Sequence, residues 1–191
     1  MGDGEFTSTF IVSKVGEWIE EIKSLSKIVC MHPHAAYCAF TNSIQHKYTY
    51  IMRTVPELGE YFVSLGEAIR TSLLPALFNG YICNDRERRL FSLPPRLGGL
   101  GISIPTERCD HEYRASHSVT IEMEQICHTE ADIQTNQIKK IAKLKQEKRK
   151  KLDQEFQELL ASSPTNEHQR ILEASNEKGA SNWLNVFPIK D

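Results

Sequence analysis

The sequence predicts an all-α protein, with a compact helical block at residues 1–105 followed by long charged helices at residues 106–191. Two observations lead to this fold class. Apolar residues recur every three or four positions through most of the chain, which is the periodicity of helices buried on one side. Helix-breaking residues gather in Phe91–Pro105, whereas neither proline nor glycine occurs from Glu112 to Ala161. Phe91–Pro105, termed the joint below, ends the block.

The first half of the block is expected to hold two helices. Ser13 is the predicted N-cap of a helix that runs to about Val29. The second helix should begin at Pro33, which suits a first helical turn, and end before Val55-Pro56. Their apolar stripes are Val15, Trp18, Ile19, Ile22, Leu25, Ile28 and Val29 in the first helix, and Ala36, Tyr37, Phe40, Ile44, Tyr48 and Ile51 in the second.

A third helix is predicted from about Glu57, and Pro75 should end or kink it. Asn79-Gly80 then indicates a turn. Asp85 is the expected cap of a short helix through Leu90. The third helix has the stripe Leu58, Phe62, Leu65, Ile69 and Leu73, and the short helix should direct Arg86, Arg88 and Arg89 outward.

The joint reads F-S-L-P-P-R-L-G-G-L-G-I-S-I-P. Pro94 and Pro95 prevent a helix from running through it, and its glycines permit backbone angles that other residues resist. It also carries regularly placed leucines and isoleucines, so it is not an ordinary solvated linker. We predict an extended or turned segment whose leucines dock on the first block, with Leu97 and Leu100 buried.

After the joint, Thr106 with Glu107 indicates a helix start, and the proline-free stretch predicts two long helices or one broken helix. Ser162-Ser163-Pro164 should stop the last of them. Three apolar stripes occur here: Val119, Met123, Ile126 and Cys127; Ile138, Ile141 and Leu144; Leu152, Phe156, Leu159 and Leu160. The stripes lose heptad register across Lys145–Lys151, which argues against a continuous coiled coil.

Thr165 is the predicted cap of a short helix through Ala174, followed by a loop at Glu177–Ser181. The chain then closes on an apolar run with little sequence left to cover it. The run comprises Trp183, Leu184, Val186, Phe187 and Ile189, and it is expected to be a truncated segment.

Composition narrows the choice of cellular compartment and of binding partner. The net charge is −2, so bulk charge does not make the chain a polyanion binder. Its five cysteines are odd in number and irregularly spaced, which favours a reducing environment. No signal peptide and no apolar run of membrane-spanning length occurs. The sequence predicts an intracellular protein of the nucleus or cytoplasm that has no membrane partner.

Catalytic and cofactor motifs are not found. The glycines of the joint lack the strand, spacing and Lys-Ser/Thr ending of a phosphate loop, and no adjacent aspartates occur. We therefore predict no enzyme activity and no cofactor. Cys30, His32, His34 and Cys38 are too close in sequence for four tetrahedral ligands, so no metal site is predicted either. A Cys/His nucleophile pair stays open, without a local signature.

Lys139–Lys151 is the strongest charge signal. It contains eight basic residues and one acidic residue, Glu147, for a local net charge of +7. The candidate nucleic-acid-binding residues are Lys139, Lys140, Lys143, Lys145, Lys148, Arg149, Lys150 and Lys151. Such a helix can lie along phosphates, with affinity that comes from counterion release. The alternative is a solvated helix face, balanced by Asp153, Glu155 and Glu158.

Three segments together resemble one known family. They are W-I-E-E-I-K-S-L-S-K-I (Trp18–Ile28), H-P-H-A-A-Y-C-A-F-T (His32–Thr41) and R-L-F-S-L-P-P-R-L-G-G-L-G-I (Arg89–Ile102). The combination is similar to the region just after the polymerase core in reverse-transcriptase-like proteins of invertebrate non-LTR retroelements. The ending G-A-S-N-W-L-N-V-F-P-I (Gly179–Ile189) is similar to a later segment of the same proteins. The resemblance covers most of the chain, and its most specific part is the Leu-Pro-x-Arg-Leu-Gly-Gly-Leu-Gly-Ile run.

The resemblance implies a thumb-like helical region that grips template and primer. The catalytic palm would precede Met1, and a nuclease or zinc-binding segment would follow Asp191, so no catalytic residue carries over. Our first hypothesis is a non-catalytic fragment of such a protein that binds RNA or DNA through the basic helix. The alternative is a helical protein-interaction module with a helical protein partner and no nucleic-acid role.

Overall fold

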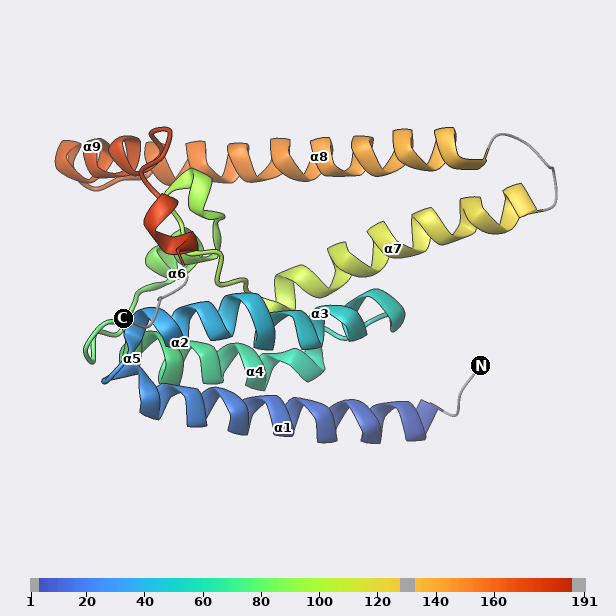
Figure 1. The fold of residues 1–191 in the computed structure, drawn as a ribbon, viewed down its shortest axis with the longest axis horizontal. Coiled ribbons are helices and arrows are strands. Elements are labelled where there is room, and N and C mark those ends of the chain that lie inside the picture. The colour runs from blue at the N-terminus through green and yellow to red at the C-terminus, as the bar shows by residue number, and fades with distance from the viewer. Residues whose placement is uncertain (1–3, 128–132, 187–191) are drawn as a thin grey trace.

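The computed structural model describes residues 4–127 and 133–186, without the side chains of residues 122–137 and 185. Every regular element in these residues is a helix and none is a strand, which confirms the all-α prediction (Figure 1). The expected contributions of the Met123, Ile126 and Cys127 side chains, and of Phe187 and Ile189, lie outside the part of the chain that is described.

Three helical runs build the first block, and they form the lower layers of Figure 1. Two of the runs are not plain α-helices, because each contains a π-helical turn. The elements are α1 (Gly4–Val29); α2 (Pro33–Ala39), the π-helical turn η1 (Phe40–Ile44) and α3 (Gln45–Thr54); and the 3₁₀ turn η2 (Glu60–Phe62), α4 (Val63–Ala68), the π-helical turn η3 (Ile69–Leu73) and α5 (Leu74–Leu77).

The core of this block is centred on aromatic rings from all three runs. Trp18 of α1 stacks on Phe62 with 6.3 Å between ring centroids, and Tyr48 of α3 lies 6.0 Å from Trp18. The predicted stripe of the third helix is buried in full (Leu58, Phe62, Leu65, Ile69 and Leu73). Two details of α1 were wrong. The helix begins at Gly4, so Ser13 does not cap it, and Ile28 is 46% exposed because it faces away from the core.

The π-helical turn at Phe40–Ile44 explains why the stripe of the second helix was partly wrong. Ile51 was expected in the core, yet it is only half-buried, and Met52 is fully buried instead. A π turn adds one residue to the helical repeat, so residues after it are rotated around the axis relative to a regular helix. The same rotation brings Gln45 and Thr49 inside.

The short helix α6 (Asp85–Ser92) precedes the joint. Its cap is Asn84, one residue before the expected Asp85, in a capping box with Glu87. Arg88 was expected to face outward, and this was wrong, because its side chain is buried at 6% exposure.

The joint turns back on itself after the 3₁₀ turn η4 (Pro95–Leu97). The backbone N–H of Ile102 donates to the Phe91 carbonyl at 3.0 Å, and that of Gly101 donates to the Leu93 carbonyl at 2.8 Å. A Cβ on Gly99 would collide with the carbonyl oxygens of Leu90 and Leu93, so only glycine fits this closure.

The second half runs out and back along the first block (Figure 1). α7 (Pro105–Cys127) packs on α3, and α8 (Ile133–Ala161) returns antiparallel to α7 above it. α9 (Asn166–Ser175) folds back on α8, and its predicted cap is confirmed, since Thr165 accepts from the His168 N–H. In the terminal 3₁₀ turn η5 (Asn182–Asn185), Leu184 is buried in the first core.

A second hydrophobic cluster joins the joint to α8 and α9, and consists of Leu93, Leu97, Phe156, Leu159 and Leu172. Leu97 is buried as predicted, but it docks on this cluster and not on the first block. Leu100 is half-buried against the first core, beside the fully buried Ile102. The joint therefore contributes to both clusters.

Candidate nucleic-acid interface

The basic run lies within α8, and it does not form one surface. Lys139, Lys143 and Lys150 are spaced by four and seven residues, so they share one helix face. Lys145 and Arg149, four residues apart, form a second row beside it. All five side chains are exposed, and within the described residues none of them has a carboxylate partner. We call these residues the five outer cations.

The other three cations of the run are held by the protein itself. Lys140 Nζ donates to the Ser118 carbonyl at 2.8 Å, which ties α8 to α7. Lys151 Nζ lies 3.8 Å from Glu155 on the next turn of α8. Lys148 turns inward and lies 3.1 Å from Glu112 of α7. The positive charge that α8 offers to solvent is therefore smaller than the sequence indicates.

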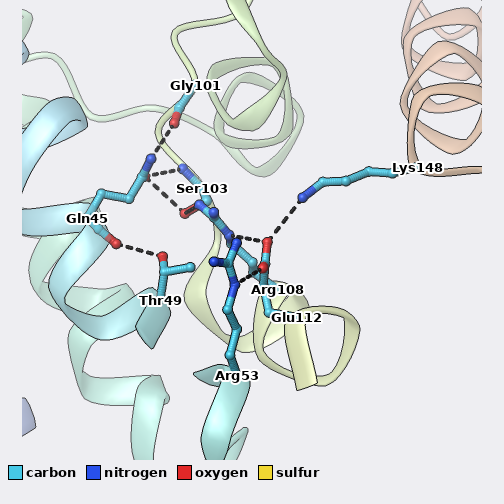
Figure 2. Close-up of polar contacts among 8 residues, drawn as sticks. All are labelled: Gln45, Thr49, Arg53, Gly101, Ser103, Arg108, Glu112 and Lys148. Carbon is cyan, nitrogen blue, oxygen red and sulfur yellow. Dashed lines mark hydrogen bonds and ion pairs between the residues drawn. The ribbon is translucent and has the colours of Figure 1, made fainter. Parts of the chain in front are cut away.

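Glu112 is the centre of a cluster of cations that comes from three helices (Figure 2). Its Oε2 accepts from Arg53 Nε of α3 at 2.9 Å. Its Oε1 accepts from Arg108 Nε at 3.2 Å and from Lys148 Nζ at 3.1 Å. The Glu112 side chain is only 6% exposed, whereas those of Lys148 and Arg53 are 44% and 55% exposed. One buried carboxylate thus binds α3, α7 and α8 together.

The protonation of Glu112 follows from this surrounding charge. Burial by itself raises the pKa of a carboxyl group, because it penalises the charged form. Lys148, Arg53 and Arg108 outweigh burial and lower the pKa of Glu112 from its ordinary value of 4.5 to about 2. Glu112 therefore stays ionised at neutral pH, and three cations share one negative charge.

A second polar group holds the joint against α3. Gln45, 6% exposed, donates from Nε2 to the Gly101 carbonyl at 3.0 Å (Figure 2). Its Oε1 accepts from the backbone N–H and the hydroxyl of Ser103, both at 2.9 Å. Tyr37 adds a hydrogen bond from its hydroxyl to the Leu100 carbonyl at 2.7 Å. These bonds satisfy backbone groups that proline and glycine leave outside any helix.

Sequence reasoning missed Gln45, Arg88 and Glu112 as structural centres. Each lies one position from an apolar stripe or inside a charged stretch, where it resembles an ordinary surface residue. Their partners lie far along the chain, so no local spacing indicates them. The usable signal was the joint itself. Its backbone N–H and C=O groups lie outside any helix and need side-chain partners, but the sequence does not identify those partners.

The cysteine and histidine cluster stays dispersed. Cys30 and His32 are exposed and Cys38 is buried, with 3.7 Å between Cys38 Sγ and His34 Nε2. Among the side chains that the structure describes, no three of His, Cys, Asp or Glu are grouped as metal ligands.

Comparison with protein-family models, curated proteins and solved structures gives no match for this chain. Among the helices of the described residues, none has both the length and the apolar character needed to cross a bilayer.

Proposed function

We propose that the chain is a non-catalytic helical part of a reverse-transcriptase-like protein, and that it binds RNA or DNA through α8. The observation that supports this most directly is the exposure of the five outer cations (Lys139, Lys143, Lys145, Arg149 and Lys150) without carboxylate partners in the described chain. The resemblance of the joint and its flanking segments to retroelement proteins supports the same proposal.

The anchored cations give this helix a fixed position. Lys140 and Lys148 hold α8 on α7, so the outer cations are presented by a helix that need not be ordered on binding. Lysines and arginines on such a helix attract phosphates without reading bases, so the affinity depends on salt and little on sequence.

The test is RNA binding measured against salt concentration. With three to five phosphates neutralised, the slope of log K against log salt should be about −2 to −3.5 for single-stranded RNA. Replacing all five outer cations with glutamine should abolish binding at low salt. The matched control replaces Lys14, Lys23, Lys27, Lys47 and Lys178, which removes the same charge from elsewhere.

The control variant should retain binding, because three of its lysines already pair with glutamates on the first block. Equal loss in both variants would mean that net charge alone matters, and no binding by the unaltered chain at low salt would end the proposal.

The retroelement origin has its own test, which is the reading frame upstream of Met1. Polymerase motifs there, in frame, are the expected result.

The second candidate is a helical protein-interaction module without a nucleic-acid role. It is favoured by apolar side chains that are exposed to solvent near the end of the described chain, since Trp183 is 62% and Val186 57% exposed. Trp183 lies beside His34, with 6.3 Å between ring centroids. Sedimentation and pull-down test this candidate, and a strict monomer that captures no partner would exclude it.

A further inference from the structure

A cleft of about 690 Å³ opens between the first block and the end of α8. Its walls come from α4, α6, the first turn of α7 and the last turns of α8. Four arginines line it: Arg70, Arg86, Arg88 and Arg89. We call it the arginine cleft.

Two of the four, Arg86 and Arg88, make no ion pair with a carboxylate in the described residues, and Arg88 is the more buried of the two. Arg88 is 6% exposed, and it donates only to the Ile102 and Ser103 carbonyls, each at 2.8 Å. Arg86 donates from Nη2 to the Leu159 carbonyl at 2.8 Å and to the Ser163 hydroxyl. The Nε–H of Arg86 is buried and has no acceptor. A buried, unpaired donor on a charged group is costly, so the Arg86 guanidinium group gains a hydrogen bond if its side chain turns toward an acceptor in the cleft.

In the described residues no carboxylate of the cleft forms an ion pair with these two groups, although the charge of Glu107 acts on Arg88. Asp85 pairs with Arg70 at 2.7 Å, and its side chain is 88% exposed, so it faces solvent. Glu67 and Glu107 also line the cleft and are exposed. Thr106, which also lines the cleft, belongs to the first turn of α7. The N–H groups of a first turn have no acceptor within the helix. Such N–H groups favour an anion.

We infer that the arginine cleft binds a phosphate group. Guanidinium groups bind phosphate oxygens through paired, charge-assisted hydrogen bonds, and a helix N-terminus adds backbone donors. The phosphate is that of a small phosphate compound or the terminal phosphate of a nucleic acid. Either would supply an acceptor to Arg86 and a counter-charge to Arg88. This site goes beyond the proposed function, because none of the five outer cations lines it.

The test uses variants that leave the buried arginines in place. Arg89 is exposed and makes no ion pair in the described chain, so Arg89→Gln removes cleft charge without disturbing the fold. The double variant Arg70→Gln/Arg89→Gln removes both rim charges. Arg114→Gln is the matched control, an exposed arginine of α7 outside the cleft. Circular dichroism checks that each variant is folded.

The measurement is titration of the full chain with inorganic phosphate and with pyrophosphate at low ionic strength, followed by ³¹P NMR. Arg89→Gln should weaken phosphate binding about tenfold, which corresponds to one charge-assisted hydrogen bond. The double variant should weaken it further, and Arg114→Gln should leave it unchanged. No binding by the unaltered chain, or equal weakening in the Arg114→Gln control, overturns the inference.

A second arm identifies the source of the phosphate. RNA oligonucleotides with and without a 5′-phosphate are compared in the unaltered chain and in Arg89→Gln. A preference for the 5′-phosphate that Arg89→Gln removes assigns the site to nucleic-acid ends, and its absence, with phosphate still bound, assigns it to small phosphate compounds. The variant that lacks the five outer cations should still bind inorganic phosphate, which separates this site from RNA binding by α8.

Discussion

At the scale of single residues, buried polar side chains decide how the helices meet. Glu112 is the clearest example, because cations from α3, α7 and α8 converge on one carboxylate that is almost inaccessible to water. Such a cluster does not necessarily stabilise the fold more than apolar packing would. It does tie the three helices together, since Arg53 of α3 and Lys148 of α8 both reach Glu112 of α7.

Replacing Glu112 with glutamine should lower the free energy of unfolding by about 1–3 kcal/mol, the cost of leaving charged groups without their partner. The loss stays moderate because Arg53 and Lys148 are half-exposed and can turn to water. Urea unfolding measures it. Glu20→Gln on the exposed face of α1 is the matched control and should change stability little.

Acid should weaken the same cluster. The pKa of Glu112 is about 2 in the folded chain against an ordinary value of 4.5, so its contribution to stability is complete above about pH 4.5 and is lost as pH falls toward 2. The unaltered chain should therefore lose more stability than Glu112→Gln between pH 5 and pH 2. Parallel pH profiles of the two chains would show that Glu112 does not carry the effect.

A further prediction at the residue scale concerns Gly99 of the joint. A Cβ at this position would collide with two carbonyl oxygens, so Gly99→Ala should destabilise the fold by at least about 1 kcal/mol. Gly16→Ala in α1 is the control. Its Cβ meets open space, and alanine there should stabilise the helix by about 0.5–1 kcal/mol. Thermal unfolding of both variants gives the comparison.

At the scale of elements, two faces of α8 have different roles. Lys148 and Lys140 face α7 and hold the helix, whereas Lys139, Lys143 and Lys150 face away from it. A continuous basic run in the sequence therefore contains both anchoring and available charges. Alternation of this kind follows from the helical repeat, since consecutive lysines point in different directions.

The two faces should separate in a pair of single variants. Lys148→Gln should lower stability by removing a partner of Glu112, and it should change RNA affinity little. Lys143→Gln should weaken RNA binding by a few-fold with unchanged stability, since one phosphate contact is lost. RNA titration and urea unfolding are measured on the same preparations. The reverse pattern would contradict the placement of charge on α8.

At the scale of the whole molecule, the chain has two hydrophobic clusters with the joint between them. The first cluster is formed mainly by the helices of the block, and the second by the joint with α8 and α9. The second cluster is small, so the attachment of α8 and α9 depends on few side chains. Phe156 is central to it, at 3% exposure.

Phe156→Ala should cost about 3–5 kcal/mol, the range for deleting a buried aromatic side chain. Hydrogen exchange should accelerate most in α8 and α9 and least in α1 and α3, because the first cluster stays intact. Phe6→Ala, at a site 71% exposed, is the control and should have little effect. Uniform loss of protection across the chain would mean that the two clusters unfold as one.

Much of the local structure could be predicted from the sequence alone, because helical periodicity, proline positions and caps act over a few residues. The stripe from Leu58 to Leu73, the break at Val55-Pro56 and the Thr165 cap are examples. The π-helical turn at Phe40–Ile44 could not be predicted from the pattern, and it replaced Ile51 by Met52 in the core.

The all-α class and the unusual character of the joint were determined by the sequence by itself, since periodicity and proline content are local properties. Only the tertiary structure decided where Leu97 docks, that Arg88 is buried, and that Lys148 pairs with Glu112. Each of these depends on partners that lie far along the chain. The physical reason is that burial and charge pairing are set by which helices pack together.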